Sequence, residues 1–120
     1  MKYFTRDEAI APLKIDTRYT DSYYLKLEDM YTQKTIMTIF IRGGQSVEVD
    51  VPLGSYYLKY AVGEKWYGEK YHFGPNTNYH KAYDVFTFEI EGEQVMGYTL
   101  ELYKQTGGNL REGIITVNDF

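Results

Sequence analysis

Hydrophobic and polar side chains alternate with a period of two along much of this chain. The clearest stretch is 45–51, where Val47, Val49 and Val51 alternate with polar residues. Alternate side chains of a β-strand point to opposite faces of a sheet, so this pattern predicts a strand with one buried face. The alternation resumes at 55–62, where one face carries tyrosines and aliphatic residues. A second strand is therefore predicted there.

The five residues VPLGS join these two stretches. Pro52 presets its own φ, and Gly54 can supply a positive φ, which together favour a tight turn. We therefore expect the two strands to pair as an antiparallel β-hairpin over 45–62.

Five further segments carry strand patterns. They are 22–28, 35–42, 85–90, 98–103 and 113–117. Residues 35–41 (TIMTIFI) are apolar on both faces, which is typical of a central strand, and Gly43-Gly44 marks the turn after it. The segments GEQVMG and TGGN are also turn-rich. Only 5–11 (TRDEAIA) could hold a turn of helix.

The side chains on the inward side of this alternation form the predicted core. Its members are Val47, Val49, Val51, Tyr56, Leu58, Tyr60, Phe86, Phe88, Leu100 and Leu102, and Ile90 and Tyr98 are expected to face inward with them. About seven short strands without a helical segment predict an all-β fold, a small antiparallel β-sandwich of the transthyretin-like or immunoglobulin-like kind. At 120 residues the chain fits one such domain, 1–120, with 1–11 as a flexible or short helical N-terminal segment.

Two resemblances support this fold class. The segment IFIRGGQSVEVDVPLGSYYLKYAVG resembles the central hairpin region of transthyretin-like and carboxypeptidase-regulatory-like sandwich domains. From about Pro12 to Phe120, the motifs TIFIRGG, VEVDVPLGSY, KYAVGEKWYGEKYHFGPNT, GYTLELYKQTGGNLR and the closing DF resemble a widespread family of uncharacterised bacterial β-sandwich domains. This second resemblance implies no activity and no catalytic residue.

Composition narrows the classes of partner and the location. The net charge is −4 and the pI about 5.1, so a nucleic-acid backbone would be repelled, and we expect no nucleic-acid binding. The most apolar stretch, 35–41, is much shorter than the ~18 residues of a membrane-spanning helix. The opening MKYFTRDEAIAPL lacks the apolar core of a signal peptide. We therefore expect a cytoplasmic protein as the sequence is written, or a secreted or periplasmic one if a leader has been removed.

Candidate metal and redox chemistry is sparse. The chain has no cysteine, which removes disulfides, thiolate metal sites and thiol catalysis. His72 and His80, with Glu69 and Asp84 nearby, form the only metal-like set, but they lack a compact ligand spacing. We expect no metal and no cofactor.

Catalytic motifs are equally weak. No serine lies in a G-x-S-x-G elbow, and IRGGQ lacks the Lys-Ser/Thr pair of a phosphate-binding loop. Glu64, Glu69 and Asp84 could form a glycosidase-like carboxylate pair, but such pairs need a deep cleft in a larger scaffold. We therefore expect that the protein is not an enzyme.

An aromatic loop, 63–82, carries the strongest functional signal. Its segment 64–80 (EKWYGEKYHFGPNTNYH) holds the only tryptophan and both histidines, and it is longer than joining two strands requires. One interpretation is a lid, in which Trp66, Tyr71 and Phe73 fold over the open end of the sandwich and Trp66 and Phe73 cap the core. The other is a binding surface, whose predicted contact residues are Trp66, Tyr67, Tyr71, His72 and Tyr79.

The sequence thus favours a non-catalytic interaction module that binds a protein partner through 64–80. An inhibitor of a host protein, of the kind encoded by phages or mobile elements, is one form of this hypothesis. The alternative is a carbohydrate or small-ligand binder that uses stacked tyrosine and tryptophan rings, with Asn76 and Asn78 at their edges. Homo-oligomerisation through edge strands is left open.

Overall fold

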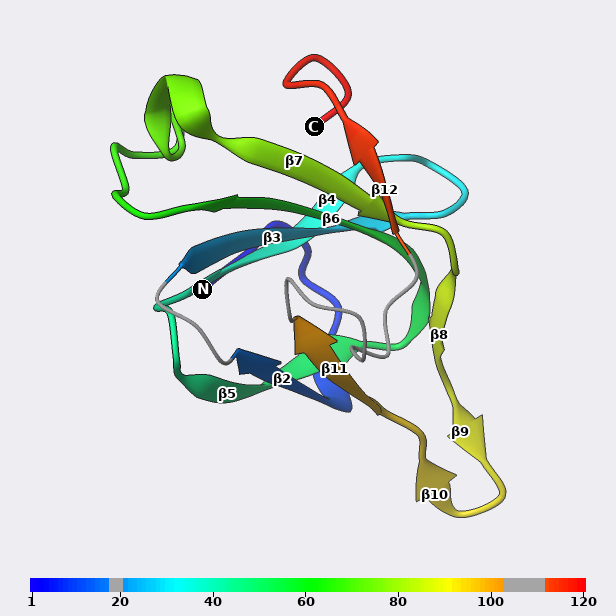
Figure 1. Cartoon of the computed structure of the whole chain (residues 1–120). Coiled ribbons are helices and arrows are strands. Elements are labelled where there is room, and N and C mark those ends of the chain that lie inside the picture. The colour runs from blue at the N-terminus through cyan, green and yellow to red at the C-terminus, as the bar shows by residue number, and fades with distance from the viewer. Residues whose placement is uncertain (18–20, 103–111) are drawn as a thin grey trace.

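The chain folds into two packed β-sheets, and strands dominate the computed structural model, which describes residues 1–17, 21–102 and 112–120 (Figure 1). Within these ranges the single helical element is a 3-10 turn, η1 (Gly74–Asn76), and there is no α-helix. The prediction of an all-β sandwich is confirmed.

The larger sheet, sheet A, is antiparallel throughout and forms the upper layer in Figure 1. Its strands run in the order β1–β4–β3–β6–β7–β12, and β8 pairs with the first part of β6. The bounds are β1 (Lys2–Tyr3), β3 (Ser22–Asp29), β4 (Thr35–Ile41), β6 (Gly54–Gly63), β7 (Asn78–Ala82), β8 (Phe86–Phe88) and β12 (Glu112–Ile115).

The smaller sheet, sheet B, lies beneath it and has three strands. Their order is β11–β2–β5, with bounds β2 (Ala9–Thr17), β5 (Ser46–Pro52) and β11 (Tyr98–Leu102). β2 and β5 are antiparallel, whereas β2 and β11 are parallel. A small hairpin of β9 (Ile90–Glu91) and β10 (Gln94–Val95) projects from the lower side of the molecule in Figure 1.

The main core fills the space between the two sheets. It combines the alternating residues of sheet A, such as Leu25 and Leu58, with those of sheet B, such as Leu13 and Ile15, all at most 1% exposed. Of the ten predicted core residues, eight are buried there, and Val47 and Val49 are partly buried against it. Period-two alternation therefore identified the inward face correctly.

The predicted hairpin over 45–62 is wrong, although both of its strands exist. β5 pairs with β2 in sheet B, and β6 pairs with β3, β7 and β8 in sheet A. The residues Pro52 to Gly54 form a corner that carries the chain from one sheet to the other, with Gly54 at φ +153°. The Tyr56 hydroxyl donates to the Pro52 carbonyl at 2.8 Å and ties this corner together. Because the sheets face each other, both strands still point their apolar sides into one core.

Four smaller expectations also fail. Residues 5–11 hold no helical turn, because β2 begins at Ala9. Ile90 lies on the projecting hairpin and is 53% exposed. β4 is not central, since its outer neighbour β1 has only two residues. The strands β2 and β7 were not predicted.

The expected turns have mixed outcomes. Gly43 and Gly44 do mark a turn, closed by the Gln45 N–H bond to the Arg42 carbonyl at 3.2 Å. GEQVMG includes the turn of the β9–β10 hairpin. TGGN, at 106–109, lies outside the described residues.

Candidate functional site

The outer face of sheet A carries an aromatic row that points away from the main core. Phe40 on β4 lies opposite Tyr24 on β3, and Tyr24 lies opposite Ala61 on β6. Ala61 in turn lies opposite Tyr79 on β7. Their sequence neighbours, such as Leu25, face inward, so strand alternation alone places these rings on the outside.

The segment 64–77 folds across this row and buries much of it. Phe73 is 5% exposed, and its ring centroid lies 5.1 Å from that of Trp66. Trp66 in turn lies 4.9 Å from the Tyr24 ring and 5.2 Å from the Phe40 ring. Gly63 makes room for this layer, because a Cβ there would lie 2.2 Å from the Phe73 Cβ. Trp66 and Phe73 therefore cover the outer face of sheet A and not the open end of the sandwich.

His72 belongs to this buried layer and is not an accessible contact residue. It is 7% exposed and adopts a positive φ of 55°, which turns its ring inward. Its Nδ1 lies 2.7 Å from the Tyr79 hydroxyl, and its ring stacks on Tyr24 at 5.8 Å. Burial, and then the positive charge of Lys26, lowers the pKa of His72.

The loop is fastened by its own hydrogen bonds. The Tyr67 N–H donates to the His72 carbonyl at 2.7 Å, and the His72 N–H donates to the Gly68 carbonyl at 2.7 Å. The Thr77 hydroxyl accepts from the Phe73 N–H at 3.0 Å and donates to the Gly74 carbonyl at 2.6 Å. These bonds satisfy backbone groups that the adjacent strands cannot reach.

Next to the aromatic row, sheet A carries a lysine band of three residues in register. Lys26, Lys59 and Lys81 lie side by side on β3, β6 and β7. Lys59 forms a salt bridge with the buried Glu28 at 3.0 Å, and Lys81 lies 4.4 Å above the Tyr57 ring. Burial is the main cause that lowers the pKa of Lys26, and the charge of Lys59 acts in the same direction.

The C-terminal segment, 116–120, lies against both features. The Phe120 ring is 5.1 Å from the His72 ring and 5.1 Å from the Tyr79 ring. The Lys26 ammonium lies 4.1 Å from the centre of the Phe120 ring and donates to the Phe120 main-chain oxygen at 3.1 Å. Lys59 donates to the main-chain oxygen of Asp119.

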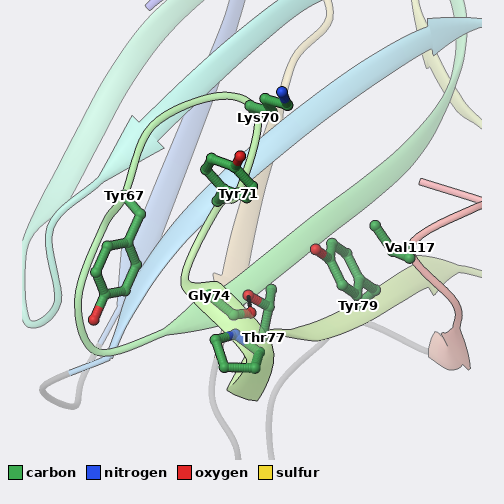
Figure 2. A pocket seen from close by; sticks show the side chains of 8 residues that line it. Tyr67, Lys70, Tyr71, Gly74, Thr77, Tyr79 and Val117 are labelled. Atoms are coloured by element: carbon green, nitrogen blue, oxygen red, sulfur yellow. Dashed lines mark hydrogen bonds between the residues drawn. The ribbon is translucent and has the colours of Figure 1, made fainter.

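Between the loop and this segment lies an open hollow of about 690 Å³, which we call the tyrosine groove (Figure 2). It is lined by Tyr67, Lys70, Tyr71, Gly74, Pro75, Thr77, Tyr79 and Val117. Tyr71 is 62% exposed and Tyr67 is 55% exposed, although both are large aromatic residues. Figure 2 shows Tyr67 on one side of the hollow, with Tyr79 and Val117 on the other.

A second hollow, of about 380 Å³, shares Tyr67 with the groove. We call it the polar hollow, and it is lined by Asp21, Gly63, Glu64, Lys65, Tyr67, Phe73, Asn76 and Asn78. Its lining combines carboxylates, amides and an ammonium group. The Lys65 ammonium lies 5.6 Å from the centre of the Tyr67 ring.

Three of the five predicted contact residues therefore come together in the tyrosine groove. They are Tyr67, Tyr71 and Tyr79, while Trp66 and His72 lie in the buried layer beneath. Lys70, Pro75 and Val117 also line the groove but were not predicted as contacts. The aromatic density of 64–80 signalled the loop residues, whereas no local pattern connects Val117 with them.

The metal-like set does not assemble. His72 lies in the outer layer, whereas His80 stacks on Tyr60 at 5.1 Å, beside the main core. In the ranges 1–17, 21–102 and 112–120, no group of three or more histidines and carboxylates is placed to hold a metal ion. Over the same ranges, no helix has the length and apolar character needed to cross a membrane.

No match was found when the chain was compared with protein-family models, with curated proteins and with solved structures. What the protein does must therefore be inferred from its own residues and their arrangement.

Proposed function

We propose that this protein is a non-catalytic interaction module that binds a protein partner through the tyrosine groove. The observation that carries the proposal is the groove itself, an open and largely apolar hollow between two tyrosines that are each more than half exposed. Concave apolar surfaces with a few polar groups are typical of binding sites, and tyrosine is enriched in protein interfaces.

The support beneath the groove suits this role. Tyr67 and Tyr71 flank a loop that is closed by its own hydrogen bonds and rests on the packed rings of Trp66 and Phe73. A tyrosine on an ordered loop has little conformational freedom to lose, so it can exchange water for contact area at low entropic cost. Lys70 places its ammonium 5.4 Å from the centre of the Tyr71 ring and adds a polar rim.

Carbohydrate binding is the second candidate, and the polar hollow is the observation that favours it. Asn76, Asn78 and Glu64 surround a hollow that has Tyr67 on its wall. Amides and carboxylates beside an aromatic ring can bond the hydroxyls of a sugar while the ring packs on its apolar face. The two candidates share Tyr67 but differ in their other residues.

A paired variant tests the proposal. Tyr67→Ala with Tyr71→Ala should abolish capture of the partner from a lysate of the source organism. Its melting temperature should stay within a few degrees of the parent, because surface substitutions usually change stability by less than about 0.5 kcal/mol each. A photo-crosslinking phenylalanine analogue at position 71 should form a covalent adduct with the same partner, which shows direct contact.

The matched control is Tyr31→Ala, since Tyr31 is 80% exposed and lies outside the groove. This variant should capture the partner as the parent does. If the double variant captures the same partner, or unfolds, the groove is not the binding surface. Binding on a glycan array that is lost with Asn78→Ala but kept with Tyr71→Ala would instead favour the carbohydrate candidate.

A further inference from the structure

Phe120 packs into a site, which we call the seat, whose walls are four side chains from β3, β7 and the loop. Aromatic walls come from Tyr24 on β3, His72 on the loop and Tyr79 on β7, with ring centroids 5.1 to 6.1 Å from that of Phe120. Lys26 lies 4.1 Å from the centre of the ring. The ring is thus surrounded by aromatic groups and by a cation, a combination that favours an aromatic side chain.

The seat also contacts the main chain of its occupant. Lys26 donates to the main-chain oxygen of Phe120 at 3.1 Å, and Lys59 donates to that of Asp119. The Asp119 carboxylate turns away and accepts from the Thr116 hydroxyl at 3.0 Å. The seat therefore contacts a phenylalanine ring and two consecutive main-chain oxygens, and these contacts do not involve the Asp119 side chain.

Beyond Ile115 no strand pairing holds the occupant, and the contacts described above are confined to Asp119 and Phe120. The backbone hydrogen bonds of 116–120 close its own turn, from the Asp119 N–H to the Thr116 oxygen at 3.0 Å and from the Phe120 N–H to the Val117 oxygen at 3.3 Å. Pairing of β12 with β7 ends at Ile115. Val117 is 56% exposed. Segments with few buried contacts open at a lower free-energy cost than the whole domain.

We propose that this seat is a peptide-recognition site for a phenylalanine-bearing segment of a partner protein, which Phe120 fills within the chain and which the partner segment can displace. The site goes beyond the tyrosine groove and does not depend on it, although Tyr79 contributes to both. A tethered occupant competes at an effective concentration in the millimolar range. Below that concentration a partner displaces it only by adding contacts that 116–120 lacks, and the adjoining groove offers such contacts.

A synthetic peptide provides the probe. The peptide IITVNDF, which copies 114–120 and carries a fluorophore at its N-terminus, is titrated with the parent and with the Phe120→Ala variant by fluorescence anisotropy. Phe120→Ala should bind the peptide at least about tenfold more tightly than the parent, because the aromatic part of its seat is vacant. Adding Lys26→Met, which keeps the aliphatic stem but removes the donor and the charge, should weaken binding again.

Controls distinguish peptide binding at the seat from binding at the groove and from non-specific adsorption. Phe120→Ala with Tyr71→Ala should bind the peptide as Phe120→Ala does, so a failure of the groove leaves this result unchanged. A peptide with alanine in place of phenylalanine should not bind. The inference is overturned if Phe120→Ala binds no more tightly than the parent, or if a leucine peptide binds equally well.

A second measurement tests the proposal even if the Phe120→Ala variant does not fold. If Phe120→Ala shows no cooperative melting, the parent is titrated with the peptide at millimolar concentration. Saturable binding that the alanine peptide lacks supports displacement of Phe120. Absence of such binding overturns it.

Discussion

The two faces of sheet A are made by the same strands but are closed in different ways. On the inner face, Leu25 and Leu58 are fully buried against the aliphatic side chains of sheet B. On the outer face, Tyr24 and Ala61 are buried beneath a loop and a short C-terminal segment. The first covering is a second sheet, and the second is a single layer of rings from the loop and from Phe120.

The difference accounts for the open hollow on the outer face. A sheet packed on a sheet fills the space between them with interdigitating side chains. A loop has no regular partner, so it fills its space with large rings and leaves gaps at its margins. The tyrosine groove is such a gap, between the loop and Val117. The inner face thus contributes most of the buried core, and the outer face carries the open hollow with its exposed tyrosines.

The largest effect is expected on the inner face. Leu58→Ala should lower the free energy of unfolding by about 2–5 kcal/mol, because Leu58 is 0% exposed and its removal leaves a cavity. Chemical denaturation followed by far-ultraviolet circular dichroism measures the loss. The matched control is Leu53→Ala, since Leu53 is 39% exposed and should cost less than about 0.5 kcal/mol. Equal losses for the two variants would contradict the assignment of the inner face.

A smaller effect, confined to the outer layer, is expected from Gly63→Ala. The new Cβ would lie 2.2 Å from the Phe73 Cβ, so the loop must shift, at a cost of about 1–3 kcal/mol. Trp66 is the only tryptophan, so its fluorescence reports on this layer alone. Its emission should shift to the red in native Gly63→Ala but stay unchanged in native Leu58→Ala. An unchanged spectrum in both would mean that the loop does not rest on Gly63.

The smallest effect is a pH dependence that arises from His72. Burial and Lys26 lower the pKa of this ring below the ordinary value of 6.5, so the folded state binds its proton less readily than the unfolded state. The contribution of His72 to stability is therefore complete above pH 6.5 and declines as the pH falls from 6.5 toward the lowered pKa.

A matched variant isolates this contribution. His72→Asn keeps a residue that tolerates the positive φ but removes the titrating ring. Between about pH 7 and pH 5.5, the melting temperature of the parent should fall further than that of His72→Asn. The same loss in both would place the pH dependence in other groups.

The inner face was predictable because burial constrains every second residue of a strand. Leu58 and Leu100 were assigned to the core from alternation alone, and both are buried. Alternation does not state which strand is the neighbour, so β5 and β6 were paired when they belong to opposite sheets. β2 was missed although Ala11, Leu13 and Ile15 alternate inward, and Pro12 is a residue that is rare inside a central strand. The structure tolerates that proline, since pairing with β11 starts one residue later, at Leu13.

The outer face was predictable only in part. The density of rings in 64–80 pointed to Tyr67, Tyr71 and Tyr79, which do line one hollow. His72 was predicted as a contact residue, but it is buried, has a positive φ and places its Nδ1 2.7 Å from the Tyr79 hydroxyl, which residue type does not reveal. The contribution of Phe120 depends on a contact between distant parts of the chain, and no local pattern encodes it.

The parallel pairing of β2 with β11 also affects the order in which the strands can pair during synthesis. Residues 13–17 are translated before their partners on one side, residues 98–102. On the ribosome, this edge of β2 therefore stays unpaired until the intervening strands and β11 have emerged, while β3 and β4 can pair soon after they leave the exit tunnel. Contacts between residues so distant in sequence slow folding, and an unpaired strand edge is prone to aggregation. One edge of β2 therefore stays unpaired until β11 has formed.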